Sequence, residues 1–72
     1  MKNNDTHVHM DGTVVDVQKG KFWIELHQGQ SKIIAQVSGK LRQHKIRILL
    51  GDVVTVALST YDLSNGIIIS RK

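Results

Sequence analysis

Alternation between apolar and polar residues constrains the fold of this 72-residue chain more than any other feature. In "FWIEL", Phe22, Ile24 and Leu26 fall on one face of an extended chain, and Trp23 and Glu25 fall on the other. This period of two is typical of a β-strand with one buried face. It predicts five strands, separated by glycine-containing segments, at "GTVVDV" (12–17), "FWIEL" (22–26), "KIIAQV" (32–37), "VVTVAL" (53–58) and "IIIS" (67–70).

One stretch between the third and fourth predicted strands does not alternate. "SGKLRQHK" (38–45) has Ser38 as a predicted N-cap and Leu41 as the inward anchor of a short helix. Five strands with such a helix between the third and the fourth are the layout of an OB-fold, an all-β, five-stranded Greek-key barrel. An SH3-like barrel is the structural alternative. Gly12 predicts a bulge or bend at the first strand, and "YDLSNG" (61–66) predicts a turn.

The length of the chain fits a single domain. We expect residues 1–6 to be a loose polar tail and residues 7–72 to form one OB-fold domain. The sequence has no cysteine, which excludes disulfides and thiolate zinc sites. It shows no secretory signal and no apolar run long enough to span a bilayer. We therefore expect a cytoplasmic monomer that does not engage membranes.

The positive charge lies in the second half of the chain. Residues 1–37 hold four basic and four acidic side chains, whereas residues 38–72 hold six basic side chains and two acidic ones. Four of the basic groups follow one another without an intervening carboxylate, at Lys40, Arg42, Lys45 and Arg47, with His44 among them. Such a run indicates a polyanionic partner, nucleic acid first and an anionic membrane surface second. A solvated, merely solubilising face is the alternative.

Few other residues could stack bases, bind a metal or take part in catalysis. Trp23 is predicted to face outward on the second strand, where OB-folds stack bases, or else to cover the barrel wall. The pair "HVH" (7–9) could bind a metal, but a structural zinc site needs four ligands, and we expect no metal and no other cofactor. Ser38 and His44 lack a third residue to orient the imidazole, so we predict no enzymatic activity. His44 is a candidate phosphate donor when its imidazole is protonated.

Several blocks of the chain resemble the bacterial translation initiation factor one family. The resemblance rests on "M-x-G-x-V" from Met10, "F-x-I-E-L-x-x-G" from Phe22 and the run "SGK-x-R…IRIL-x-GD-x-V-x-V…YDL-x-x-G-x-I", in that order and at near-family spacing. It covers nearly the whole chain and implies an OB-fold protein without catalytic activity. The positions that would face RNA, carried over onto this sequence, are Lys40, Arg42, Arg47, Tyr61 and Arg71.

The resemblance also implies a function and a set of partners. A member of this family would bind the small ribosomal subunit at the A site, contacting the decoding region of 16S ribosomal RNA and one small-subunit ribosomal protein. It would exclude tRNA from that site and support initiation factors two and three.

This sequence departs from the family pattern at several positions. The loop after the first strand reads "QKGK" where Pro-Asn is usual, so Lys19 and Lys21 are expected to offer charge to the RNA there. Lys45 stands before "IRIL", where the family usually has an aromatic residue, and Thr60 stands before "YDL", where the family usually has a proline. Ile67 follows "YDL-x-x-G", where the family usually has an arginine, and this replacement removes an expected phosphate contact. The chain is thus a somewhat divergent member.

Two other functions fit the same composition. A general cold-shock-like RNA-binding protein or RNA chaperone would bind free single strands, and its binding would quench the fluorescence of Trp23. A protein-interaction barrel would use an apolar outer set, Ile34, Ile67 and Ile69, and its binding would be insensitive to salt.

Overall fold

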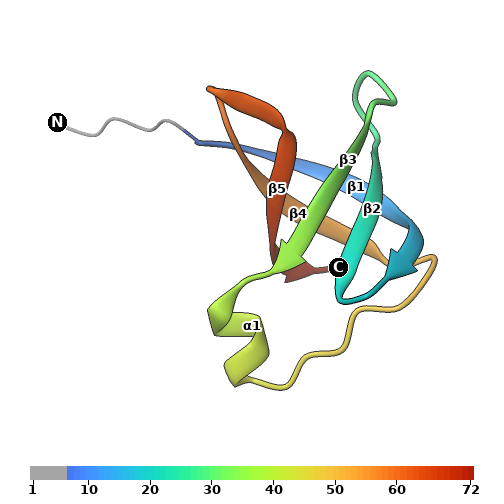
Figure 1. Ribbon diagram of the computed structural model, residues 1–72, viewed down its shortest axis with the longest axis vertical. Coiled ribbons are helices and arrows are strands. Elements are labelled where there is room, and N and C mark those ends of the chain that lie inside the picture. Colours follow the sequence, from blue (N-terminus) through green and yellow to red (C-terminus); the bar gives the residue numbers. More distant parts are fainter. Residues whose placement is uncertain (1–6) are drawn as a thin grey trace, which may run out of the picture.

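The computed structural model describes residues 7–72, and the predicted tail (1–6) lies outside the described residues. Five strands and one short helix follow one another along the chain (Figure 1). In order they are β1 His7–Gln18, β2 Lys21–Leu26, β3 Lys32–Val37, α1 Gly39–Gln43, β4 Val53–Ser59 and β5 Asp62–Arg71.

The strands form a closed barrel in the order β1-β2-β3-β5-β4. The long strand β1 closes one side, because its first part pairs with β4, from His7↔Ser59 to Thr13↔Val53, and its last part pairs with β2. The other side is closed by the parallel pairing of β3 with β5. This barrel, with its helix between β3 and β4, confirms the predicted OB-fold. Closure leaves little of the sheet edge exposed to other chains.

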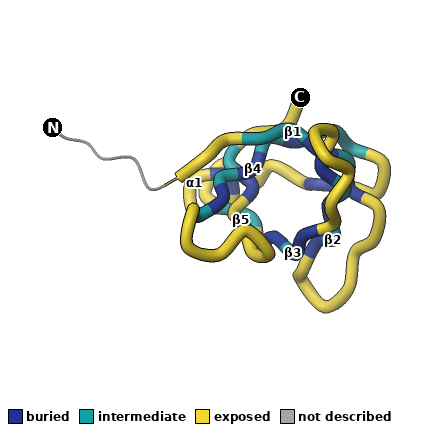
Figure 2. Tube along the Cα trace, turned by 90° about the horizontal axis from the view of Figure 1, so that it is seen from above, coloured by how far each residue is buried: buried dark blue, intermediate teal, exposed yellow. Residues whose placement is uncertain are grey.

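The core is formed by the apolar residues that alternation placed inward. Every second residue of β2 and β4 is buried, and Figure 2 shows the buried positions around the inside of the ring. The buried apolar residues are Val14, Phe22, Ile24, Leu26, Ile33, Ala35, Leu41, Ile48, Val54, Val56, Leu58 and Ile68. Val37, the last residue of β3, is only half-buried.

The predicted start of the first strand and the predicted bulge were both wrong. Strand β1 begins at His7, since its first residues, in which Val8 and Met10 alternate with polar residues, pair with β4. The register shift lies between Val14 and Asp16 and not at Gly12. Gly12 has a different role, because a Cβ built there would lie 2.5 Å from Ile24 Cγ2. The glycine thus permits a close approach between β1 and β2.

The turn predicted at "YDLSNG" (61–66) is confirmed only at Tyr61, and its predicted extent was wrong. The chain reverses at Thr60 and Tyr61, and β5 already begins at Asp62. The Asp62 carboxylate accepts hydrogen bonds from the Ser64 backbone N–H (3.1 Å), the Ser64 hydroxyl (2.6 Å) and Asn65 Nδ2 (3.0 Å). These bonds, Ser64 first, lower the pKa of Asp62. They stabilise an irregular start of β5, and Asn65 then pairs with Ile34 of β3.

Candidate nucleic-acid interface

Helix α1 holds the basic segment against one end of the barrel. Ser38 is extended (φ −64°, ψ 157°), and its hydroxyl accepts a hydrogen bond from the Leu41 N–H at 3.2 Å, so the predicted N-cap is confirmed. The Ser38 N–H donates to the Ile68 carbonyl of β5 at 3.0 Å. Leu41 is 6% exposed and is the one residue of α1 that joins the core, as predicted. The helix is therefore fixed to the barrel at its start and through one side chain.

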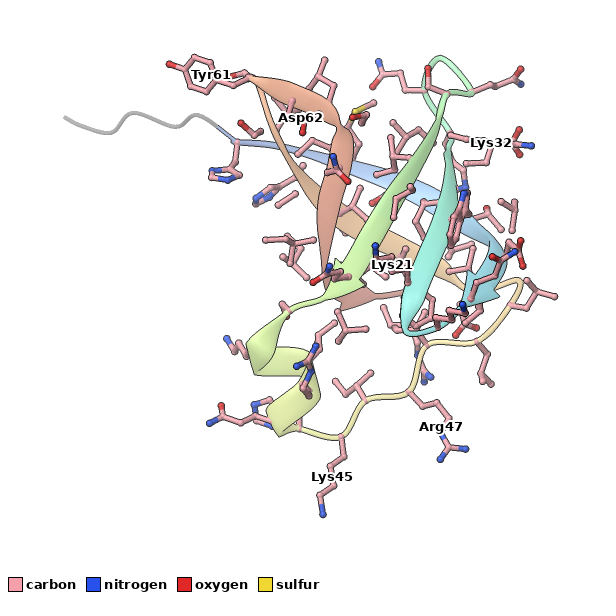
Figure 3. All side chains as sticks on the ribbon, viewed as in Figure 1. Lys21, Lys32, Lys45, Arg47, Tyr61 and Asp62 are labelled. Carbon is pink, nitrogen blue, oxygen red and sulfur yellow. The ribbon has the colours of Figure 1, made fainter. Side chains whose placement is uncertain are left out.

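A Schellman motif ends the helix and turns the chain back along the barrel. The Lys45 N–H donates to the Arg42 carbonyl and the Ile46 N–H to the Leu41 carbonyl, both at 3.1 Å. Lys45 itself has a left-handed backbone with φ 56°. Behind it, Ile48 is buried while Arg47 is exposed. The motif thus allows Lys45 and Arg47 to project from the same end of the molecule, as Figure 3 shows.

We refer to Lys40, Arg42, His44, Lys45 and Arg47 as the basic cluster. All five side chains are exposed. Within residues 7–72 none of them has a carboxylate or any other side-chain partner, and the ion pair found there, Lys72 with Asp11 at 3.2 Å, lies elsewhere. The charges of the cluster are therefore not neutralised within the described part of the protein. An external anion would meet them without displacing an internal partner.

Arg71 joins this end of the barrel from the last residue of β5. Its Nη1 donates a hydrogen bond to the Arg47 carbonyl at 2.9 Å. The contact places a further guanidinium beside the basic cluster, although Arg71 is far from it in sequence. The carbonyl of Arg47 is satisfied by this bond, whereas its own guanidinium stays exposed.

An open groove of about 380 Å³, which we call the end groove, lies among these residues. Its apolar lining comes from Phe22 of β2, Val37 of β3 and two isoleucines of the following loop, and Gly20 of the β1–β2 turn borders it. Three members of the basic cluster complete its lining: Arg42, Lys45 and Arg47. Lys19 precedes Gly20 in the same turn. An apolar floor with a cationic rim fits an unstacked base together with its phosphates.

The other predicted RNA-binding residues do not lie in the end groove. Lys21 lines a separate hollow of about 340 Å³ on the outer face of the barrel, together with Ile34, Gln36, Asn65, Gly66 and Ile67. Trp23 is half-buried on the outer face of β2, opposite Ile34 in the β2–β3 register, in agreement with the predicted outward orientation. Tyr61 is 86% exposed at the β4–β5 turn. Figure 3 places Tyr61 at the end of the barrel opposite Lys45 and Arg47.

Two features of the interface, both of which join residues distant in sequence, were not predicted. The apolar floor of the end groove joins residues of β2, β3 and the loop after α1, and no local pattern connects them. The contact of Arg71 with Arg47 likewise depends on closure of the barrel. The apolar floor could have been partly predicted from "IRIL", because the alternation of arginine with apolar residues there predicts one buried and one exposed side.

Asp11 and His27, which lie outside the basic cluster, make contacts within the barrel. A hydrogen bond from Thr55 and the contact with Lys72 lower the pKa of Asp11, which is thus held as a structural carboxylate. His27 is in the β2–β3 turn and shares a hydrogen bond with the Thr13 hydroxyl at 2.8 Å. No three histidine, cysteine or acidic residues of the described part gather as metal ligands. None of its helices is long and apolar enough to cross a membrane.

The chain is similar in fold to solved structures of known proteins. No protein-family model matches the chain. The chain is similar to the solution structure of translation initiation factor one from the Wolbachia endosymbiont strain TRS of Brugia malayi, with 38% identity and a TM-score of 0.78 over 93% of this chain and 79% of that one. It also matches YjeQ from Thermotoga maritima, with 22% identity and a TM-score of 0.77 over 90% of this chain and 23% of that one. At this identity, the second match shows the fold alone.

Proposed function

Because the chain belongs to the translation initiation factor one family, we propose that it binds the small ribosomal subunit at the A site. It contacts the decoding region of 16S ribosomal RNA and one small-subunit ribosomal protein. It excludes tRNA from that site and supports initiation factors two and three. The protein acts in this way as a monomer in the cytoplasm.

The single observation that carries the proposal is the basic cluster, whose side chains have no partner within residues 7–72. Each cation that neutralises a phosphate releases condensed counterions, so affinity for RNA falls as salt rises. The logarithm of the binding constant falls by about 0.7–0.9 for each contact when the salt concentration rises tenfold. At about 0.1 M salt, one such contact is therefore worth roughly fivefold to eightfold in affinity. Several contacts together suffice to hold a small protein on folded RNA.

The mode of recognition follows from the scarcity of aromatic residues. The chain has one Trp, one Tyr and one Phe, and Phe22 is buried. Tyr61 lies at the end of the barrel away from Lys45 and Arg47. A general binder of single strands stacks successive bases on several rings. This chain is better suited to hold a shaped RNA by its phosphates and sugars, with at most one base in the end groove.

The test is a pair of alanine substitutions at exposed positions, Arg42→Ala and Arg47→Ala. Removal of both contacts should weaken binding to purified small subunits by about 25- to 60-fold at 0.1 M salt and lower the salt slope by about 1.5. Lys32→Ala is the matched control, because Lys32 lies away from the basic cluster (Figure 3) and should have little effect. Circular dichroism of both variants should match that of the unchanged protein.

Sedimentation with small subunits, with and without initiation factors two and three, measures the binding. An unlabelled single-stranded oligonucleotide is added as competitor. Unchanged binding by the double variant would contradict the assignment of the interface. Displacement by modest amounts of the oligonucleotide, with quenching of Trp23 fluorescence, would point to general single-strand binding.

A further inference from the structure

Three residues other than glycine have a left-handed backbone within the part of the chain that the structure describes. They are Lys19 with φ 49°, Gln30 with φ 56° and Lys45 with φ 56°. A side chain with a Cβ destabilises this conformation, which glycine adopts freely and asparagine tolerates best among the rest. Two of the three positions therefore hold lysine where the backbone alone would favour another residue.

Lys19 is the first residue of the two-residue turn between β1 and β2. The pair Gln18↔Lys21 closes the hairpin, and both Lys19 and Gly20 have positive φ (49° and 79°). These are the signs of a type I′ turn, for which Asn-Gly is the favoured sequence. Lys19 is exposed, and its side chain has no partner among residues 7–72. No internal contact explains a lysine here.

Lys45 occupies a left-handed position at the end of helix α1, as Lys19 does in the β1–β2 turn. It is the left-handed residue of the Schellman motif that ends α1, where glycine or asparagine is usual. Its side chain is exposed and also has no partner in the described residues. The two lysines belong to segments that border the same hollow, since Gly20 and Lys45 both line the end groove.

We propose that Lys19 and Lys45 are a pair of phosphate contacts beside the end groove, which the protein retains although they lower its stability. The proposal rests on the proposed function, because the phosphates are those of the bound RNA strand. Strained positions persist where function needs them. A strand that lies along the apolar floor places its backbone at the rim, and there the two ammonium groups meet it from two separate segments of the chain.

Gln30 provides the matched control for backbone strain. It has the same left-handed conformation, but it is uncharged and lies in the β2–β3 turn, at the end of the barrel away from α1 (Figure 1). Three variants relieve strain in the same chemical way: Lys19→Asn, Lys45→Asn and Gln30→Asn. Lys45→Arg keeps both the charge and the strain.

The experiment measures the thermal midpoint and the binding to small subunits for each variant. All three asparagine variants should melt about 2–5 °C higher than the unchanged protein. Lys19→Asn and Lys45→Asn should each bind roughly fivefold to eightfold more weakly at 0.1 M salt, with a salt slope lower by about 0.7–0.9. Gln30→Asn should bind as the unchanged protein does, and Lys45→Arg, which keeps the left-handed strain, should have the thermal midpoint of the unchanged protein.

The possible outcomes separate the two proposals. If the unchanged protein binds subunits and both lysine variants bind equally well, the paired contacts are refuted while the proposed function stands. If either lysine variant melts lower than the unchanged protein, the stability cost is refuted. Weaker binding by Gln30→Asn would assign the loss to the turns in general and would also refute the pair. Absence of any binding by the unchanged protein would overturn both proposals.

Discussion

Replacement of Leu41 by alanine should weaken RNA binding although Leu41 contacts no RNA. Leu41 is 6% exposed and is the only buried residue of α1. Lys40 and Arg42 flank it on the same five-residue helix, which is too short to be stable alone. Their positions therefore depend on the packing of one side chain into the end of the barrel.

The expected loss of stability can be derived from this packing. Truncation of a buried leucine to alanine costs about 2–5 kcal/mol, and less where the surroundings can collapse. Because α1 covers an end of the barrel and has solvent on its other side, we expect about 2–3 kcal/mol. A domain of this size is stable by roughly 4–10 kcal/mol. The thermal midpoint should therefore fall by about 10–20 °C while the protein stays folded in the cold.

The matched control is Leu50→Ala, the same substitution at a residue that is 65% exposed. Calorimetry gives the thermal midpoint, and sedimentation with small subunits at about 10 °C gives the affinity. Leu41→Ala should lose affinity by a factor similar to that of Arg42→Ala, roughly fivefold to eightfold. Leu50→Ala should retain its stability within about 0.5 kcal/mol. If Leu41→Ala melts together with Leu50→Ala, the helix is not anchored as described.

Two further predictions concern the barrel. Gly12→Ala should destabilise the protein by about 1–3 kcal/mol in urea unfolding, because the added Cβ would lie 2.5 Å from Ile24 Cγ2 and 2.8 Å from the Glu25 carbonyl oxygen. Gly39→Ala adds a methyl group in open space and should instead be neutral or stabilising by up to about 1 kcal/mol, so equal effects would disprove the steric argument. Asp11→Asn should lower stability at neutral pH, because the hydrogen bond from Thr55 and the contact with Lys72 hold the pKa of Asp11 below its ordinary value of 3.8. This stabilisation is fully present above the ordinary value and is lost as the pH falls through the lowered pKa, so the difference should narrow only in melts below about pH 4, and a gap independent of pH would contradict it.

Local sequence was a good guide wherever the neighbours of a residue in sequence decide its environment. Alternation in β2 and β4 predicted their buried faces, and Ser38 predicted the start of α1. The same reasoning failed at the ends of the strands. Strand β1 extends back to His7 because β4 pairs with it, and β5 begins at Asp62 because a carboxylate stabilises its irregular start.

The same distinction applies to the candidate interface, where some residues could be predicted from sequence and the positions of others could not. The basic cluster was identified from sequence, because its members are close in the chain and the segment contains no carboxylate. Sequence could not reveal that Tyr61 lies at the other end of the barrel or that Lys21 lines a different hollow. Both positions depend on the strand order, which is a property of the closed barrel.

The amino-acid sequence by itself determined that the chain is all-β, which faces are apolar and where the positive charge is concentrated. These properties depend on residue type and on periods of a few residues. Tertiary structure alone decided which distant residues share a groove: Phe22, Val37 and Ile48 meet there, and Arg71 reaches Arg47. The reason is that closure of the barrel pairs β3 with β5, which brings segments some thirty residues apart side by side, as in Ile34↔Asn65.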